Sequence, residues 1–142
     1  MEKIIKIITC ICIVSVFTDA YASVNTETDT LGSTIISLNL EKPYHIQTIN
    51  DYCGKVLIIS FPDQAYIILT NGNLFEFPSD KYIPEYKKYK KNRTIRGGKM
   101  NNCYWRIDKY KSLKIYYLNV LENKKTKYDN ILNNAIINTL TK

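Results

Sequence analysis

The chain shows short runs of alternating apolar and polar residues between residues 33 and 120. Residues 45–52 and 113–120 have the two-residue period of strands, whose successive side chains point to opposite faces. The other β-prone runs are 34–40, 55–61, 65–70, 73–77 and 103–108. Turn-forming residues separate most of these runs, and Asn71-Gly72 is the strongest hairpin signal among them. The pattern predicts an antiparallel sheet of about six to seven strands, connected as hairpins in a meander.

Two segments show the three- and four-residue apolar spacing of helices instead. In the first, Tyr82, Tyr86 and Tyr89 lie on one side of a short helix predicted near residues 80–91. The second covers residues 122–139, where one apolar stripe is formed by Tyr128, Ile131, Leu132, Ala135, Ile136 and Leu140. This amphipathic C-terminal helix is expected to pack on the sheet. The predicted fold class is therefore α+β.

The first 22 residues have the three parts of a secretory signal peptide. Lys3 and Lys6 form a positive region, an apolar run continues to residue 17, and Ala20 and Ala22 supply the small residues that a signal peptidase reads. Cleavage is expected after Ala22. A membrane anchor is the alternative, but the apolar run is well short of the about 20 residues that span a bilayer. The protein is therefore expected to be periplasmic or secreted.

Removal of residues 1–22 leaves 120 residues, the size of one domain. Residues 23–32 are polar and show no period, so they are expected to form a flexible N-terminal lead. Residues 92–102 contain two consecutive glycines and are expected to form a flexible loop. Residues 33–142 are predicted to form a single α+β domain.

Cleavage of the signal peptide would remove two of the four cysteines and leave Cys53 and Cys103. An even pair of cysteines delivered to an oxidising compartment predicts a Cys53–Cys103 disulfide. The alternative is two free thiols. A metal site or a redox site is disfavoured, because the chain has no CxxC motif and a single histidine.

The positive charge of the chain is concentrated in one stretch. The formal net charge is +7, and residues 81–99 hold eight basic residues with Glu85 as their only acid. The eight are Lys81, Lys87, Lys88, Lys90, Lys91, Arg93, Arg96 and Lys99. Such a patch attracts acidic protein surfaces, anionic lipid headgroups, lipopolysaccharide phosphates or nucleic acid.

The basic patch has two other interpretations. Lysine, isoleucine, asparagine and tyrosine all have AT-rich codons and are abundant here, so the lysines can also be ordinary solvated surface of a protein from an AT-rich genome. Nucleic acid is disfavoured as a partner, although tyrosines alternate with the basic residues, because an exported domain rarely meets it. An acidic protein is the preferred partner and an anionic membrane surface is the second.

The chain carries no recognisable catalytic motif. His45 is its only histidine, which excludes a pair of catalytic histidines and a multi-histidine metal site. The candidate catalytic carboxylates are Asp51, Asp63, Glu76, Asp80 and Asp108, and their spacing selects no pair. No enzyme activity, cofactor or metal is therefore expected.

Taken together, these features favour a small exported binding protein. An inhibitor or an immunity protein that binds an acidic effector or enzyme fits them best, because the patch would complement an acidic surface. The alternative is an envelope-associated accessory or virulence protein that contacts anionic lipid or lipopolysaccharide through the same patch.

Overall fold

A computed structural model describes residues 24–52, 54–72 and 82–140 of the 142-residue chain. The predicted signal peptide at 1–22, Cys53, the strand predicted at 73–77 and Lys81 lie outside the described residues. Within those three ranges, no helix is long and apolar enough to cross a bilayer.

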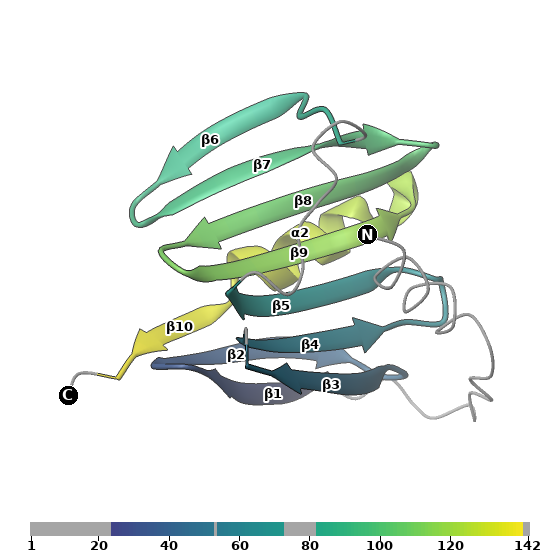
Figure 1. The fold of residues 1–142 in the computed structure, drawn as a ribbon. Helices are drawn as coiled ribbons and strands as arrows, with labels where there is room; N and C mark the ends of the chain where they lie inside the picture. Colours follow the sequence, from purple (N-terminus) through teal and green to yellow (C-terminus); the bar gives the residue numbers. More distant parts are fainter. Residues whose placement is uncertain (1–23, 53, 73–81, 141–142) are drawn as a thin grey trace.

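Two antiparallel sheets and one α-helix make up the described part of the chain (Figure 1). The strands are β1 (Val24–Leu31), β2 (Thr34–Glu41), β3 (His45–Asp51), β4 (Gly54–Ser60), β5 (Tyr66–Gly72), β6 (Tyr86–Lys90), β7 (Arg93–Met100), β8 (Cys103–Tyr110), β9 (Leu113–Val120) and β10 (Ile136–Thr139). A 3-10 turn, η1 (Glu122–Lys124), leads into the helix α2 (Lys125–Asn133). The large sheet has the order β3-β4-β5-β9-β8-β7-β6, and the small sheet has the order β1-β2-β10.

The main core lies on one face of the large sheet, here called the inner face, where the small sheet and α2 contribute side chains (Figure 1). Apolar residues of β4, β5 and β9 join those of β2 in one buried cluster. From α2, the cluster includes Tyr128, Ile131 and Leu132. The Tyr128 and Phe61 rings are nearly perpendicular, with ring centroids 5.2 Å apart. Each such fully buried side chain stabilises the fold by about 1.5–3 kcal/mol.

A second buried cluster lies on the opposite face of the large sheet, here called the outer face. It contains Val56, Ile58, Ile68, Trp105, Tyr116 and Leu118. Tyr82, in the connection that leads to β6, packs edge-on against Trp105 with ring centroids 5.6 Å apart. The central strands β4, β5 and β9 are therefore apolar on both faces, which explains their nearly continuous hydrophobic sequences.

The predicted sheet class is confirmed in its coarse form, as antiparallel sheets with a helix. The described residues form ten strands in two sheets, where six or seven strands in one sheet were predicted. The hairpin predicted at Asn71-Gly72 is wrong, because both residues lie inside β5. The left-handed turn residues are Asn101 and Asn102 instead, which join β7 to β8 with φ angles of 50° and 64°. Asparagine adopts positive φ more readily than other side chains do, so this pair suits a two-residue hairpin.

The helix predicted near residues 80–91 is wrong for its described part, because Tyr86–Lys90 forms strand β6. Residues 92–102, predicted to be a flexible loop, contain strand β7. The glycine at position 97 lies opposite Tyr86, and a Cβ atom there would come within 2.2 Å of the Tyr86 hydroxyl. That glycine therefore makes room for a tyrosine ring of the neighbouring strand and is not a sign of a flexible loop.

Two further boundaries differ from those predicted. The polar lead predicted at residues 23–32 contains strand β1, which pairs with β2 along its whole length. The C-terminal helix ends at Asn133, well before residue 139, and Ile136–Thr139 pairs with β2 as strand β10. The β-branched residues of this last segment favour an extended backbone over the predicted helix.

Candidate functional site

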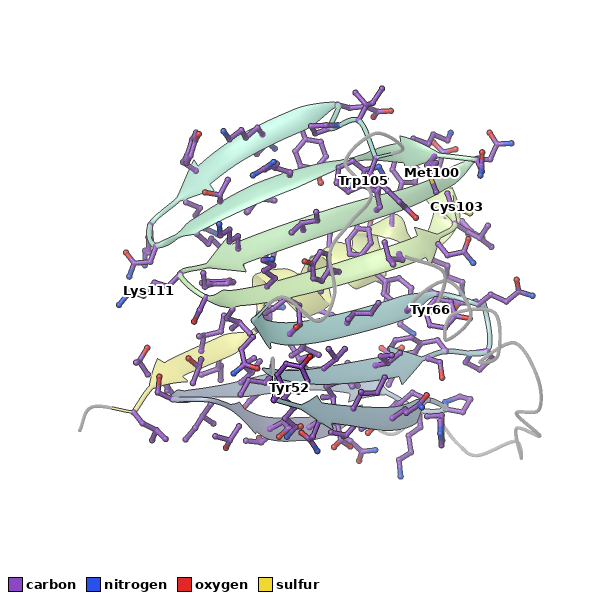
Figure 2. All side chains as sticks on the ribbon, viewed as in Figure 1. Tyr52, Tyr66, Met100, Cys103, Trp105 and Lys111 are labelled. Carbon is purple, nitrogen blue, oxygen red and sulfur yellow. The ribbon has the colours of Figure 1, made fainter. Side chains whose placement is uncertain are left out.

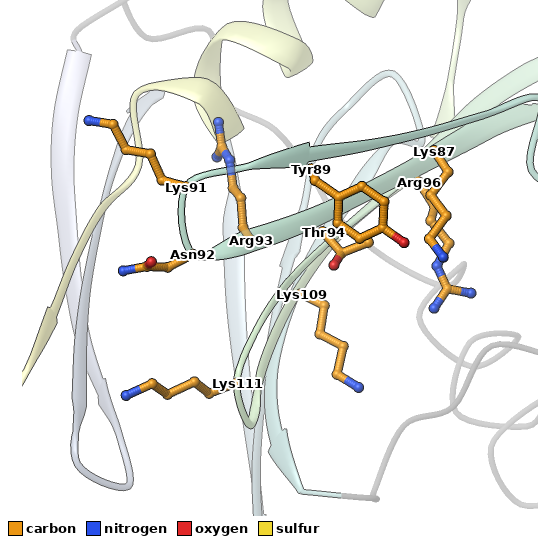
Figure 3. Close-up of a pocket in the computed structure, with 9 residues that line it drawn as sticks. All are labelled: Lys87, Tyr89, Lys91, Asn92, Arg93, Thr94, Arg96, Lys109 and Lys111. Carbon is orange, nitrogen blue, oxygen red and sulfur yellow. The ribbon is translucent and has the colours of Figure 1, made fainter.

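Basic residues gather at the end of the large sheet where β6 turns into β7 and β8 into β9. Lys87, Arg96 and Lys109 lie on the outer face of the strands, whereas Lys91 and Lys111 belong to the two turns and point away from Lys109 (Figure 3). Lys87, Tyr89, Lys91, Arg96, Lys109 and Lys111 line an open hollow of about 570 Å³ there, and we call these six residues the basic face (Figure 3). None of its five cations makes an ion pair with a described residue. Tyr89 is 74% exposed, and its ring centroid lies 5.1 Å from Lys87 Nζ. The face therefore presents unneutralised charge beside an exposed aromatic ring.

Strand register places like charges directly opposite each other on the outer face of the large sheet, including one lysine, Lys114, beside the basic face. Lys87 pairs with Arg96 between β6 and β7, and Lys109 pairs with Lys114 between β8 and β9. Like charges in such cross-strand positions destabilise a sheet. The arrangement therefore works against the stability of the protein alone, and an anion bound across these strands would relieve the repulsion.

Only part of the basic patch predicted from the sequence lies on the basic face. Lys88 and Lys90 are exposed but alternate with Lys87, so they point to the inner side of β6. Lys99 lies at the other end of β7, where it is 3.7 Å from the Glu122 carboxylate. Arg93 lines the same hollow but is buried and points toward α2, away from Arg96 and Lys109 (Figure 3).

Sequence reasoning missed the contribution of the β8–β9 hairpin. Lys109 and Lys111 lie outside the stretch of concentrated charge, but β8 pairs with β7 and so brings Lys109 opposite Thr94. The alternation of residues in 103–110 was the available signal, because it places Lys109 on the same face as Trp105. The charge of the site thus comes from two hairpins.

Beneath β7 and β8, on the inner face, lies a buried network of charges that anchors α2. Asp108 is fully buried and accepts hydrogen bonds from Arg106 Nε at 2.7 Å, Arg106 Nη2 at 2.8 Å and Arg93 Nη1 at 3.0 Å. Arg106 also donates to Asp129 at 3.0 Å and to Asn133 at 2.8 Å, both in α2. Burial alone would lower the pKa of Arg106, but Asp108 and Asp129 raise it above its ordinary value. The network holds the helix against the sheet, because Arg106 and Arg93 bond both to Asp108 and to groups of α2.

Asp129 is expected to make stability depend on acidic pH. Burial by itself raises its pKa, but hydrogen bonds from Lys125, Arg106 and Tyr117 hold the pKa below its ordinary value of 3.8. Because the pKa is lower in the folded state, this stabilisation is complete above about pH 4 and is lost as the pH falls through the folded pKa.

The variant Asp129→Asn tests this dependence. Chemical denaturation between pH 7 and pH 2 should show a wild-type advantage in the free energy of unfolding that is constant near neutrality and shrinks below about pH 4. The comparison with the variant removes the contribution of other acids that titrate in both proteins. An advantage that stayed unchanged at pH 2 would contradict the assigned role of the carboxylate.

A second hollow, of about 190 Å³, lies between the two sheets and is mostly apolar. Its edge carries Glu27 and Asp29 of β1, which alternate with exposed threonines and therefore point inward. The Glu27 carboxylate accepts a hydrogen bond from the Tyr44 hydroxyl, and Asp29 forms an ion pair with Lys55. Both carboxylates already have partners. We therefore interpret this hollow as part of the packing between the two sheets.

Cys103 is half-buried at the start of β8 and has no disulfide partner among the described residues. Figure 2 shows Cys103 beside Met100, its partner in the pairing of β7 with β8. The disulfide predicted between Cys53 and Cys103 stays a prediction, because Cys53 lies outside the described residues.

Among the residues considered for catalysis, Glu76 and Asp80 lie outside the described residues, and His45, Asp63 and Asp108 form no common site in the part that the structure describes. His45 is exposed at the start of β3. Asp108 belongs to the buried network, and Asp63 accepts hydrogen bonds of 3.0 and 3.1 Å from the Tyr128 hydroxyl. No group of three histidine, cysteine, aspartate or glutamate side chains converges as metal ligands in the ranges that the structure describes. The chemistry offered by the basic face is the binding of anionic groups.

Comparisons of the chain with protein-family models, with curated proteins and with solved structures found no match. The geometry of the basic face is thus the observation that bears on function.

Proposed function

We propose that this protein is a small exported binding protein whose basic face holds an acidic surface of a partner protein, as an inhibitor or immunity protein would. The pairs of like charges across the strands, Lys87 with Arg96 and Lys109 with Lys114, carry the proposal. They concentrate positive charge that no described acid neutralises. Export is supported by the signal-peptide pattern of residues 1–22.

The position of the basic face supports a protein partner over loose surface charge. Three of its cations project from paired strands, so their backbone positions are held by the ladder of the large sheet. A rigid arrangement of charges loses less entropy on binding than charges on a loose tail. The exposed ring of Tyr89 adds the kind of aromatic contact that is enriched in protein interfaces.

A pair of charge reversals tests this proposal. The double variant Lys87→Glu with Lys109→Glu is compared with a control, Lys42→Glu with Lys124→Glu, which changes the net charge equally at exposed sites away from the basic face. Each tagged protein is used to capture proteins from cells of its source, and bound proteins are quantified by mass spectrometry. We expect an acidic protein that wild type and control retain, and that the basic-face variant retains at least about tenfold less.

Equal capture of the same proteins by both double variants would contradict the proposal. Flotation with vesicles containing phosphatidylglycerol provides a second arm. If the protein binds only such vesicles, and binding fades steeply with added salt, then the envelope-associated function replaces the one proposed here.

A further inference from the structure

Strand β6 forms one edge of the large sheet. It pairs with β7 on one side, and on the other side no strand pairs with it within the described ranges. Alternate backbone N–H and C=O groups of such an edge strand point away from the sheet and remain open to another strand. Among the described strands, this lysine-rich strand is thus also an edge whose outward hydrogen-bonding groups pair with no other described strand.

The lysines of β6 point to both faces of the sheet. The register with β7 places Lys87 on the outer face opposite Arg96, and places Lys88 and Lys90 on the inner side opposite Ile95 and Arg93. All three lysines are exposed. A partner that rests flat on the outer face would reach Lys87 but not Lys88 or Lys90. An occupant that uses all three must run along the edge itself.

The lysines of β6 also determine which kind of segment can pair with this edge. Lysines on an edge strand disfavour pairing with a second copy of the same strand, because the like charges would lie side by side. An extended acidic segment meets no such penalty, since its side chains alternate between the two faces and can place carboxylates beside the lysines on each. The exposed ring of Tyr89 offers apolar contact on the outer face.

We propose that the acidic partner docks through an extended segment that adds a strand to the free edge of β6. This proposal rests on the function proposed above and specifies how the partner binds. Backbone hydrogen bonds to β6 would supply part of the affinity, and lysines on both sides of the strand would select for acidic residues.

The test uses an acetylated and amidated peptide of sequence TEEVEETV, which has glutamates facing both ways when extended. Its control has the same sequence with three N-methylated backbone nitrogens, which keeps the charge and removes hydrogen-bond donors. Binding to the purified protein is followed by fluorescence anisotropy at low salt. We expect the unmethylated peptide to bind at least about tenfold more tightly than its control, because several backbone hydrogen bonds are lost together.

Variants and hydrogen exchange separate strand addition from simple charge attraction. Lys88→Glu with Lys90→Glu should weaken peptide binding at least about tenfold, whereas Lys42→Glu with Lys124→Glu should not. The peptide should also slow amide exchange within β6.

Equal binding of the two peptides, or unchanged amide exchange in β6, would contradict the addition of a strand. Neither result would contradict the function proposed for the basic face. Failure of both peptides to bind would also contradict the addition of a strand, while capture of an acidic partner by the basic face remains a separate measurement.

Discussion

Replacing Asp108 by asparagine should lower the free energy of unfolding by about 3–5 kcal/mol, which is the cost of removing one partner from a buried ion pair. Asp108 is fully buried, and its carboxylate accepts hydrogen bonds from both Arg93 and Arg106. Asparagine keeps the shape but leaves two guanidinium groups without their shared counter-charge. A loss of this size is a large part of the stability of a domain of this length.

Denaturation with guanidinium chloride, followed by circular dichroism, measures this loss. The matched control is Glu41→Gln, which breaks the exposed ion pair between Glu41 and Lys127. That variant should cost less than about 1 kcal/mol, because exposed pairs contribute little. If Asp108→Asn were no more destabilising than Glu41→Gln, the buried network would not anchor α2 as described.

Gly54→Ala is expected to be the most damaging change of a glycine. Gly54 has a φ of 142°, in a region that side chains rarely adopt, and a Cβ atom there would lie 2.1 Å from the backbone oxygen of Asn71. The clash is with the neighbouring strand, so it can be relieved only by moving β4 from β5. Backbone strain and overpacking together should reduce the free energy of unfolding by about 3 kcal/mol or more.

Gly32→Ala is the control for this variant. Gly32 also has a positive φ, of 61°, but its added Cβ would meet only the side-chain nitrogen of Asn71, at 2.8 Å. Since that amide can rotate away, we expect a loss of about 1–2 kcal/mol from the left-handed backbone alone. Thermal unfolding of both variants should therefore show the larger decrease for Gly54→Ala, and the reverse order would contradict the close approach of the two strands.

The strands that could be predicted from the sequence are those with alternating or continuous apolar residues. Residues 113–120 were predicted with the observed ends, because their inward side chains, such as Ile115 and Tyr117, belong to the main core. Strand β1 could not be found in this way. Its inward positions hold Glu27 and Asp29, whose partners Tyr44 and Lys55 come from elsewhere in the chain. The regular threonines of β1 were the only local signal.

The sequence prediction for the region around the basic face was wrong because the local spacing of tyrosines indicated a helix, whereas pairing with β7 makes this segment a strand. Tyr82 and Tyr86 fit one helix face in sequence, but in the structure one packs on Trp105 at the outer face and the other covers a glycine of β7. The concentration of lysine was visible in the sequence. The burial of Arg93 was not, because it depends on Asp108, a residue of the next strand.

The central position of β2 in the small sheet has a consequence for the order of folding. This strand pairs with β1, which precedes it directly, and with β10, which follows it by almost the whole length of the domain. Synthesis and translocation both deliver the chain from its N-terminus, so the β1–β2 hairpin can form early, whereas β10, the third strand of the small sheet, comes much later. Completion of the small sheet therefore requires a contact of very high sequence separation, which we expect to be among the slow steps of folding.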